Sequence, residues 1–119
     1  MPFKVILKTL VESVPAASGA ILADWEGEAV EQFCLYDDYE IKVTGAHEGI
    51  ILNHLKDVYA DFPGGGLEEV VTVTGEQQVI VGVVGADYSL VMTLAREALL
   101  GLALQRFREA VQVLEKEIY

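Results

Sequence analysis

The sequence predicts an α+β fold whose elements follow the order α-β-β-α-β-β-β-α. Apolar residues recur at helical spacing in three segments, and short runs rich in β-branched residues lie between them. Glycine-containing turns separate most of these runs, which favours antiparallel neighbours. A chain of 119 residues is expected to form a single domain, 1–119. The expected helices are 3–14, 44–60 and 97–117, and the expected strands are 17–24, 29–35, 67–74, 78–84 and 88–94.

The first segment, 3–14, predicts an amphipathic helix that ends at Pro15. Lys8 and Glu12 interrupt its apolar residues at helical spacing, whereas a secretory signal would have an uninterrupted apolar run. Residues 17–24 and 29–35 then predict a β-hairpin around Gly27.

Residues 36–44 allow two interpretations. Tyr39, Ile41 and Val43 alternate with polar residues at the spacing of a strand, so the segment could extend the second strand. It could also be a loop that leads into the central helix. We expect that helix to begin after Thr44, which would serve as its N-cap, and to end near Ala60.

The central helix carries too few charged residues for a helix with one side in water. Gly45 and Gly49 each weaken it by about 1 kcal/mol, which suggests a packing reason for them. We therefore expect the helix to pack on both sides, with another chain on the outer one. The stripe expected against the sheet is Ile51, Leu55, Val58 and Phe62, and the small residues roughly opposite are Ala46, Gly49, Asn53 and Ala60.

The last helix, 97–117, carries a regular apolar stripe, which predicts burial of one face against the sheet. Its expected members are Leu100, Leu104, Phe107, Val111, Leu114 and Ile118.

The charge is strongly acidic and unevenly distributed. The formal net charge is −11, and twelve acidic residues against two lysines between Asp24 and Glu69 account for −10 of it. Nucleic acid and anionic membranes are disfavoured as partners, while a basic protein surface would be attracted. A surface that only maintains solubility is an equal alternative. Cys34 is the only cysteine, which favours a reducing compartment and hence the cytoplasm.

No pattern in the sequence assembles a catalytic or metal site. His47 and His54 share a helix face but lie two turns, about 10.5 Å, apart, too far to ligate one ion together. Glu68 and Glu69 are strand neighbours and point to opposite faces. We expect no enzyme, no metal and no cofactor, and no apolar run is long enough to cross a membrane.

Four segments, in their order and spacing, resemble the Roadblock family of small α/β proteins. The first strand and its turn are similar to the family's first hairpin, and residues 44–55 to the start of its central helix. Residues 79–94 resemble a pair of the family's strands, and residues 99–103 the entry to its last helix. The segments read SGAILAD (18–24) with EGE (26–28), TGAHEGIILNHL, VIVGVVGADYSLVMTL and LLGLA. The longer stretch at 36–43 and the acidity depart from the family pattern.

The resemblance implies a profilin-like, five-stranded antiparallel sheet, with the terminal helices on one face and the central helix on the other. It also implies a homodimer in which two central helices pack antiparallel and two sheets join at the edges formed by 67–74. A Val-rich edge strand needs cover in any case. The predicted dimer interface is Ala46, Gly49, Ile50, Asn53, His54, Asp57, Val71 and Val73.

The family implies a non-catalytic function, as a regulator of small Ras-like GTPases or a dynein light chain. The leading hypothesis is a homodimeric adaptor that binds a small Ras-like GTPase and modulates its nucleotide cycle or localisation. Arg96, Arg106 and Arg108 fall at or within the last helix, so we expect no arginine finger. The alternative is a small-molecule-sensing or purely structural module of the same fold.

Overall fold

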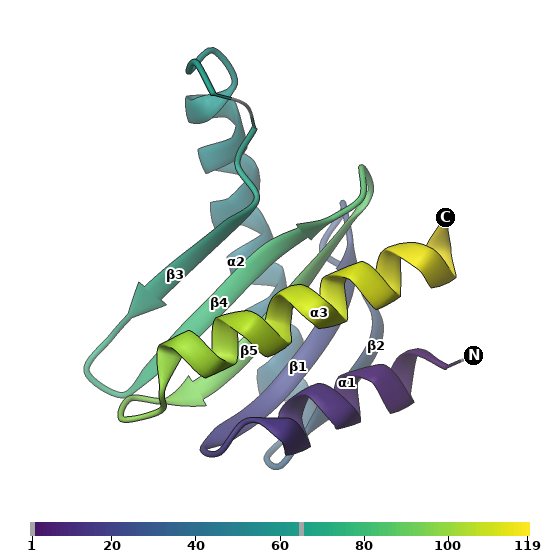
Figure 1. Ribbon diagram of the computed structural model, residues 1–119, viewed down its shortest axis with the longest axis vertical. Helices are drawn as coiled ribbons and strands as arrows, with labels where there is room; N and C mark the ends of the chain where they lie inside the picture. The colour runs from purple at the N-terminus through teal and green to yellow at the C-terminus, as the bar shows by residue number, and fades with distance from the viewer. Residues whose placement is uncertain (1, 65) are drawn as a thin grey trace.

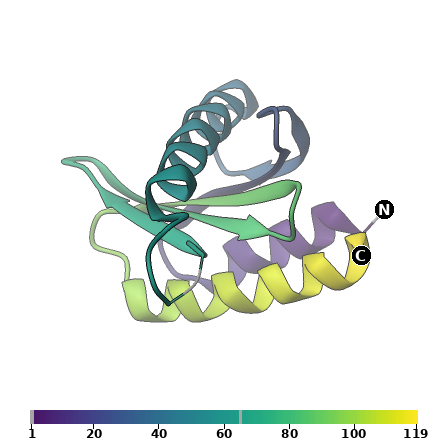
Figure 2. The ribbon, with the colours of Figure 1, turned by 90° about the horizontal axis from the view of Figure 1, so that it is seen from above.

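A computed structural model describes residues 2–64 and 66–119, and its element order is the predicted α-β-β-α-β-β-β-α. The five strands form one antiparallel sheet in the order β2-β1-β5-β4-β3. Helices α1 and α3 lie side by side on one face of the sheet, and α2 crosses the other face (Figures 1 and 2). The elements are α1 Phe3–Ser13, β1 Ala17–Asp24, β2 Ala29–Cys34, α2 Asp38–Tyr59, β3 Glu69–Val73, β4 Gln77–Val84, β5 Tyr88–Ala95 and α3 Leu100–Ile118.

The larger core lies between the sheet and the two terminal helices. Phe107 of α3 is buried and its ring lies directly over Gly82 of β4, where any Cβ would collide with it. Leu7 and Leu10 of α1 are buried in the same core, beside the residues of α3. The predicted α3 stripe is confirmed in outline, since Phe107 and Leu114 are buried and the other four members are half-buried against this core.

The smaller core lies under α2. Its buried members come from the helix and from β1, β4 and β5: Ile21, Ile41, Leu52, Val79, Val81 and Val91. The two cores cover opposite faces of the same sheet, which confirms the predicted three-layer arrangement.

The central helix begins six residues earlier than Thr44, the expected N-cap. Its N-cap is Asp37, whose Oδ1 accepts a hydrogen bond of 3.0 Å from the Tyr39 N–H, and Asp38 and Glu40 lie in the first turn. Acidic side chains are favourable there because they face the positive end of the helix dipole. The strand-like alternation of Tyr39, Ile41 and Val43 therefore lies inside a helix, so the expectation of a strand or loop at 36–44 is wrong from Asp38 onward.

The prediction of which face of α2 packs on the sheet is also wrong. The buried residues are Ile41, Gly45, Glu48 and Leu52, while Ile51 is 37% exposed, Val58 57% and Phe62 54%. Gly45 explains the difference, because a Cβ there would lie 3.0 Å from Cγ2 of Ile21 in β1. The helix thus approaches the sheet on the side of Gly45 and leaves Ile51 and Val58 exposed, together with Phe62 just beyond the helix end.

The β1–β2 and β4–β5 turns contain the glycines expected there. Gly27 ends the first hairpin turn with φ of +88°, where Asp24 Oδ1 accepts hydrogen bonds from the N–H groups of Glu26 and Glu28. Gly85 has φ of +62° in the β4–β5 turn. Left-handed backbone of this kind favours glycine. None of the helices in the described residues is long and apolar enough to cross a membrane.

Candidate protein–protein interface

The solvent-facing side of α2 exposes an unusual amount of apolar surface. Tyr39 is 70% exposed and Ile50 60%. Ile51 and Val58 of the same helix are also exposed, and Phe62 extends the apolar surface just beyond the helix end. The C-terminal turns of α2 extend beyond the sheet, and the segment that leads to β3 runs back beside them (Figure 1). A surface of this kind on one helix is typical of a protein–protein contact.

The β3 strand adds a second feature at one edge of the sheet. It is an edge strand, bonded to β4 on one side, and its other side has no strand partner in the described part of the chain. Val73 is 57% exposed and Val71 is half-buried against the larger core. An open, Val-rich edge offers backbone N–H and C=O groups to an additional strand.

The structure places the predicted interface residues in two groups. Six lie on α2, where Ile50, Asn53, His54 and Asp57 are exposed while Ala46 and Gly49 are half-buried. Val71 and Val73 lie on β3. Ile50 is central to the outer side of α2, whereas Gly49 lies on its flank, near Asp24 and Trp25 at the first hairpin turn. The interface that these eight residues would form stays a prediction.

The two glycines of α2 have different surroundings. Gly45 is buried against Ile21, so its lack of a side chain lets the helix lie close to the sheet. A Cβ at Gly49 would meet nothing within 4 Å. The packing reason expected for both glycines is therefore found inside the monomer for Gly45, whereas nothing in the monomer requires a glycine at position 49.

Sequence reasoning missed Tyr39, Ile51 and Val58 as exposed apolar residues. Tyr39 was obscured by its strand-like spacing, and the other two were assigned to the sheet. A signal was available in the sequence, since Ile41, Gly45, Glu48 and Leu52 also follow helical spacing. The series does not look like a buried stripe, because two of its four members are a glycine and a glutamate.

Glu48 is a charged residue in the layer between α2 and the sheet. Its side chain is 8% exposed, and Oε1 has no hydrogen-bond partner among residues 2–64 and 66–119. Burial raises the pKa of the Glu48 carboxyl, and the neighbouring His47 partly offsets this rise. A buried carboxylate without a partner costs stability, so α2 is held less firmly than a fully apolar face would hold it.

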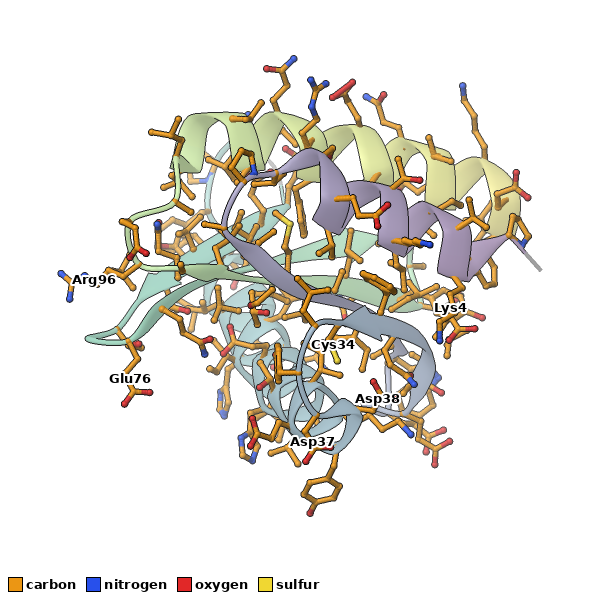
Figure 3. The ribbon with its side chains drawn as sticks, turned by 90° about the horizontal axis from the view of Figure 1, so that it is seen from below. Lys4, Cys34, Asp37, Asp38, Glu76 and Arg96 are labelled. Atoms are coloured by element: carbon orange, nitrogen blue, oxygen red, sulfur yellow. The ribbon has the colours of Figure 1, made fainter. Side chains whose placement is uncertain are left out.

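The junction of β2 and α2 gathers Cys34, Asp37 and Asp38 (Figure 3). The Cys34 Sγ lies 3.0 Å from the Tyr36 carbonyl oxygen and 3.2 Å from Asp38 Oδ1, so its one S–H is shared between these two acceptors. Burial is the main cause that raises the pKa of this thiol. A raised pKa lowers the thiolate fraction, which does not favour nucleophilic chemistry.

The arginines are engaged in different ways. Arg108 holds the Glu69 carboxylate with two nitrogens, at 2.9 Å from Nε and 2.7 Å from Nη2, which ties α3 to β3. Arg106 Nη1 contacts Glu109 at 3.0 Å. Arg96 points away from the body of the protein (Figure 3). Within the residues that the structure covers, no three His, Cys, Asp or Glu side chains are grouped to hold a metal ion.

Comparison with known proteins places the fold. No family model and no curated protein matches the sequence. Among solved structures, a Roadblock/LC7 domain from Streptomyces avermitilis aligns with a TM-score of 0.88 at 19% identity, over 97% of this chain and 96% of that one.

Two further structures extend the comparison. The gliding protein MglB from Thermus thermophilus aligns with a TM-score of 0.85 at 14% identity, over 96% of this chain and 86% of that one. Profilin II from Acanthamoeba castellanii aligns at 0.69 and 12% identity, over 98% and 99% of the two chains. Such low identities carry the fold alone. The element order, the five-stranded sheet and these alignments together identify the chain as a profilin-like α+β protein with the Roadblock/LC7 fold.

Proposed function

We propose that this protein is a non-catalytic, homodimeric adaptor that binds a small Ras-like GTPase and modulates its nucleotide cycle or localisation. The observation that carries the proposal is the apolar outer surface of α2 beside the open edge of β3, on a Roadblock/LC7 fold. We place the protein in the cytoplasm, where its single cysteine stays reduced.

The homodimer explains why α2 exposes so many apolar residues. In a two-fold arrangement each α2 covers the other, and Ile50 of one copy is buried by its partner. The β3 edges of the two copies can pair in the same arrangement, which would satisfy their free backbone groups. Ile50 and Val73 are exposed outside the two cores and the outer backbone edge of β3 pairs with no described strand, so these groups remain available for association, whereas Val71 packs against the larger core.

The GTPase is the partner class that the Roadblock resemblance implies, and MglB, a protein of the same fold, is described as a gliding protein. The charge distribution agrees with a protein partner that presents a basic surface. The stretch from Asp24 to Glu69 carries −10 of the −11 net charge and includes all of α2. Long-range attraction of this kind raises the rate of association.

The dimer is tested by Ile50→Glu, measured by light scattering. A carboxylate at the centre of the helix pair would be buried twice, so the dimer should weaken at least about a hundredfold. Val30→Glu on β2 is the matched control, since Val30 is exposed but lies on the opposite edge strand. An unchanged mass for Ile50→Glu, or an equal loss in both variants, would contradict the α2 interface.

The regulatory function is tested with the GTPase that the wild-type protein retains in a pull-down. Wild type and Val30→Glu should retain it and alter its rate of GTP hydrolysis or nucleotide release. Because we propose no arginine finger, Arg96→Ala and Arg108→Ala should keep any stimulation of hydrolysis within about tenfold. A collapse of stimulation in either variant would mean that the protein contributes a catalytic side chain.

A further inference from the structure

The two histidines of the chain lie on the outer side of α2, one on each side of Ile50. His47 is three residues before Ile50 and His54 is four residues after it, so the three side chains follow one stripe of the helix. All three residues are exposed, and neither imidazole takes part in an ion pair within residues 2–64 and 66–119. Both rings are therefore open to a group from outside the monomer.

Within one chain the two rings cannot hold one ion together, because two turns of helix, about 10.5 Å, separate them. A dimer with Ile50 at its two-fold axis changes this distance, because such an axis makes the two α2 helices antiparallel. His47 of one copy then lies about 4.5 Å from the axis along the helix, and His54 of the second copy lies about 6 Å from it in the same direction. The two rings of such a pair are therefore level to within about 1.5 Å along the helix.

Asp57 adds a carboxylate beside each pair of rings. It is exposed and lies three residues after His54, which places these two side chains next to each other on the helix surface. Side chains on a helix lean toward its N-terminus, so His47 of one copy leans away from the axis, while His54 and Asp57 of the second copy lean toward it. At the usual separation of packed helices, about 8–10 Å, these three side chains converge on one space.

The charge of the α2 side supplies an independent reason for a cation at this contact. Residues 24–69 carry twelve acidic residues against two lysines, a net charge of −10, and this stretch includes all of α2. Two copies that join through α2 bring these negative surfaces together, and like charges repel each other. A cation bound between the copies offsets this repulsion.

We propose that the homodimer binds two divalent ions of the zinc class, each held by His47 of one copy and by His54 and Asp57 of the second copy. This inference rests on the proposed homodimer and adds a metal site to it. Two imidazole nitrogens and a carboxylate oxygen are ligands that Zn²⁺ prefers, and a water completes the four-coordinate site. Because the complete site exists only in the dimer, the ion strengthens the dimer, and the availability of the metal sets how much of the protein is dimeric.

The inference is tested by measuring the dissociation constant of the dimer by analytical ultracentrifugation, first in EDTA and then with an excess of Zn²⁺. Zn²⁺ should lower the dissociation constant about tenfold or more, with one ion bound per chain. Mg²⁺ at the same concentration should leave it unchanged, because Mg²⁺ prefers oxygen ligands in an octahedral arrangement. This comparison separates ligation by imidazole from general screening of the acidic surface.

His47→Ala and His54→Ala should each abolish the response to Zn²⁺ and still form a dimer in EDTA. Each variant by itself lacks one ligand in both sites of its dimer. A mixed dimer of the two variants keeps one complete site, because one copy supplies His54 and the other supplies His47. Energy transfer between differently labelled copies should therefore show that Zn²⁺ stabilises the mixed dimer. A site within a single chain would not be restored by mixing.

Asp57→Asn tests the third ligand. A neutral amide is a poorer ligand for Zn²⁺ than a carboxylate, so this variant should reduce the effect of Zn²⁺ on the dissociation constant about threefold or more. Glu12→Gln is the matched control, since it also removes one exposed carboxylate but lies on α1, across the sheet from α2 (Figure 2). It should respond to Zn²⁺ as the wild type does.

Two results would overturn this inference and leave the homodimer intact. The first is a dimer whose dissociation constant is the same in EDTA and in Zn²⁺. The second is a response to Zn²⁺ that persists in both histidine variants or is not restored in the mixed dimer. A wild-type protein that is monomeric under every condition, as Ile50→Glu is expected to be, would contradict the homodimer itself and the metal site with it.

Discussion

The two faces of the sheet are covered in different ways. On one face, α1 and α3 bury large side chains such as Leu7, Phe107 and Leu114, each exposed by 1% or less. On the other face, α2 buries a glycine and a glutamate alongside Ile41 and Leu52, and leaves Ile50 and other apolar residues exposed. The first face holds the monomer together, whereas the second keeps much of its apolar surface for contacts outside the monomer.

This difference teaches that apolar content does not identify the buried face of a helix. In α3 the apolar stripe and the buried face coincide, because the other side is charged. In α2 apolar residues surround the helix, so the closest approach to the sheet, at Gly45, decides which side is buried.

The largest expected effect on stability comes from the core between α3 and the sheet. Phe107→Ala removes a ring that fills the space over Gly82 and should lower the free energy of unfolding by about 3–5 kcal/mol. Phe62→Ala, at an exposed position of the same residue type, should change it by less than about 1 kcal/mol. Urea denaturation in the Ile50→Glu background, which we expect to be monomeric, measures both. Similar losses for the two would remove the distinction between the faces.

The next largest effect tests whether Gly45 sets the distance between α2 and the sheet. Gly45→Ala and Gly49→Ala gain the same helix propensity of about 1 kcal/mol, but only the first places a methyl group 3.0 Å from buried Ile21. Gly45→Ala should therefore be less stable than Gly49→Ala by about 1–3 kcal/mol in the same urea experiment. Equal stabilities would mean that α2 can move away from the sheet at no cost.

A smaller effect depends on pH through Glu48. Because burial raises its pKa in the folded state above the ordinary value of 4.5, the native protein binds a proton that the unfolded chain releases. Stability due to this group is full below pH 4.5 and is lost as pH rises through the folded pKa. Glu48→Gln lacks this loss, so it should match wild type near pH 4 and exceed it by about 1 kcal/mol at pH 7. Thermal unfolding across pH 4–7 measures the difference; parallel curves would show that Glu48 is not the cause.

The smallest effect concerns the start of α2. Asp37→Ala removes the hydrogen bond that the Tyr39 N–H donates to the Asp37 carboxylate and should lower the free energy of unfolding by about 0.5–1 kcal/mol. Asp37→Asn keeps the cap and should cost much less. The circular dichroism signal of the helix on urea titration distinguishes the two; equal losses would place the effect in the charge rather than in the cap.

Much of the fold was predictable from local sequence. The strands from β1 to β5 and the helices α1 and α3 were placed within a few residues, because their apolar spacing, turns and β-branched residues agree with one another. The start of α2 was not predicted, since the alternation of Tyr39, Ile41 and Val43 is compatible with a strand until the Asp37 cap and the packing of Ile41 select a helix. Of the candidate interface, sequence alone named Ile50 and Val73, and the structure shows both exposed.

The sequence by itself determined the order of the elements, the acidic middle and the absence of a recognisable catalytic pattern, because these depend on residue type and local spacing. The tertiary structure decided which side of α2 faces the sheet and which residue of α3 covers Gly82. The physical reason is that both depend on how closely two elements can approach. That distance is set by single contacts, such as Gly45 against Ile21 or Phe107 over Gly82, between residues far apart in the chain.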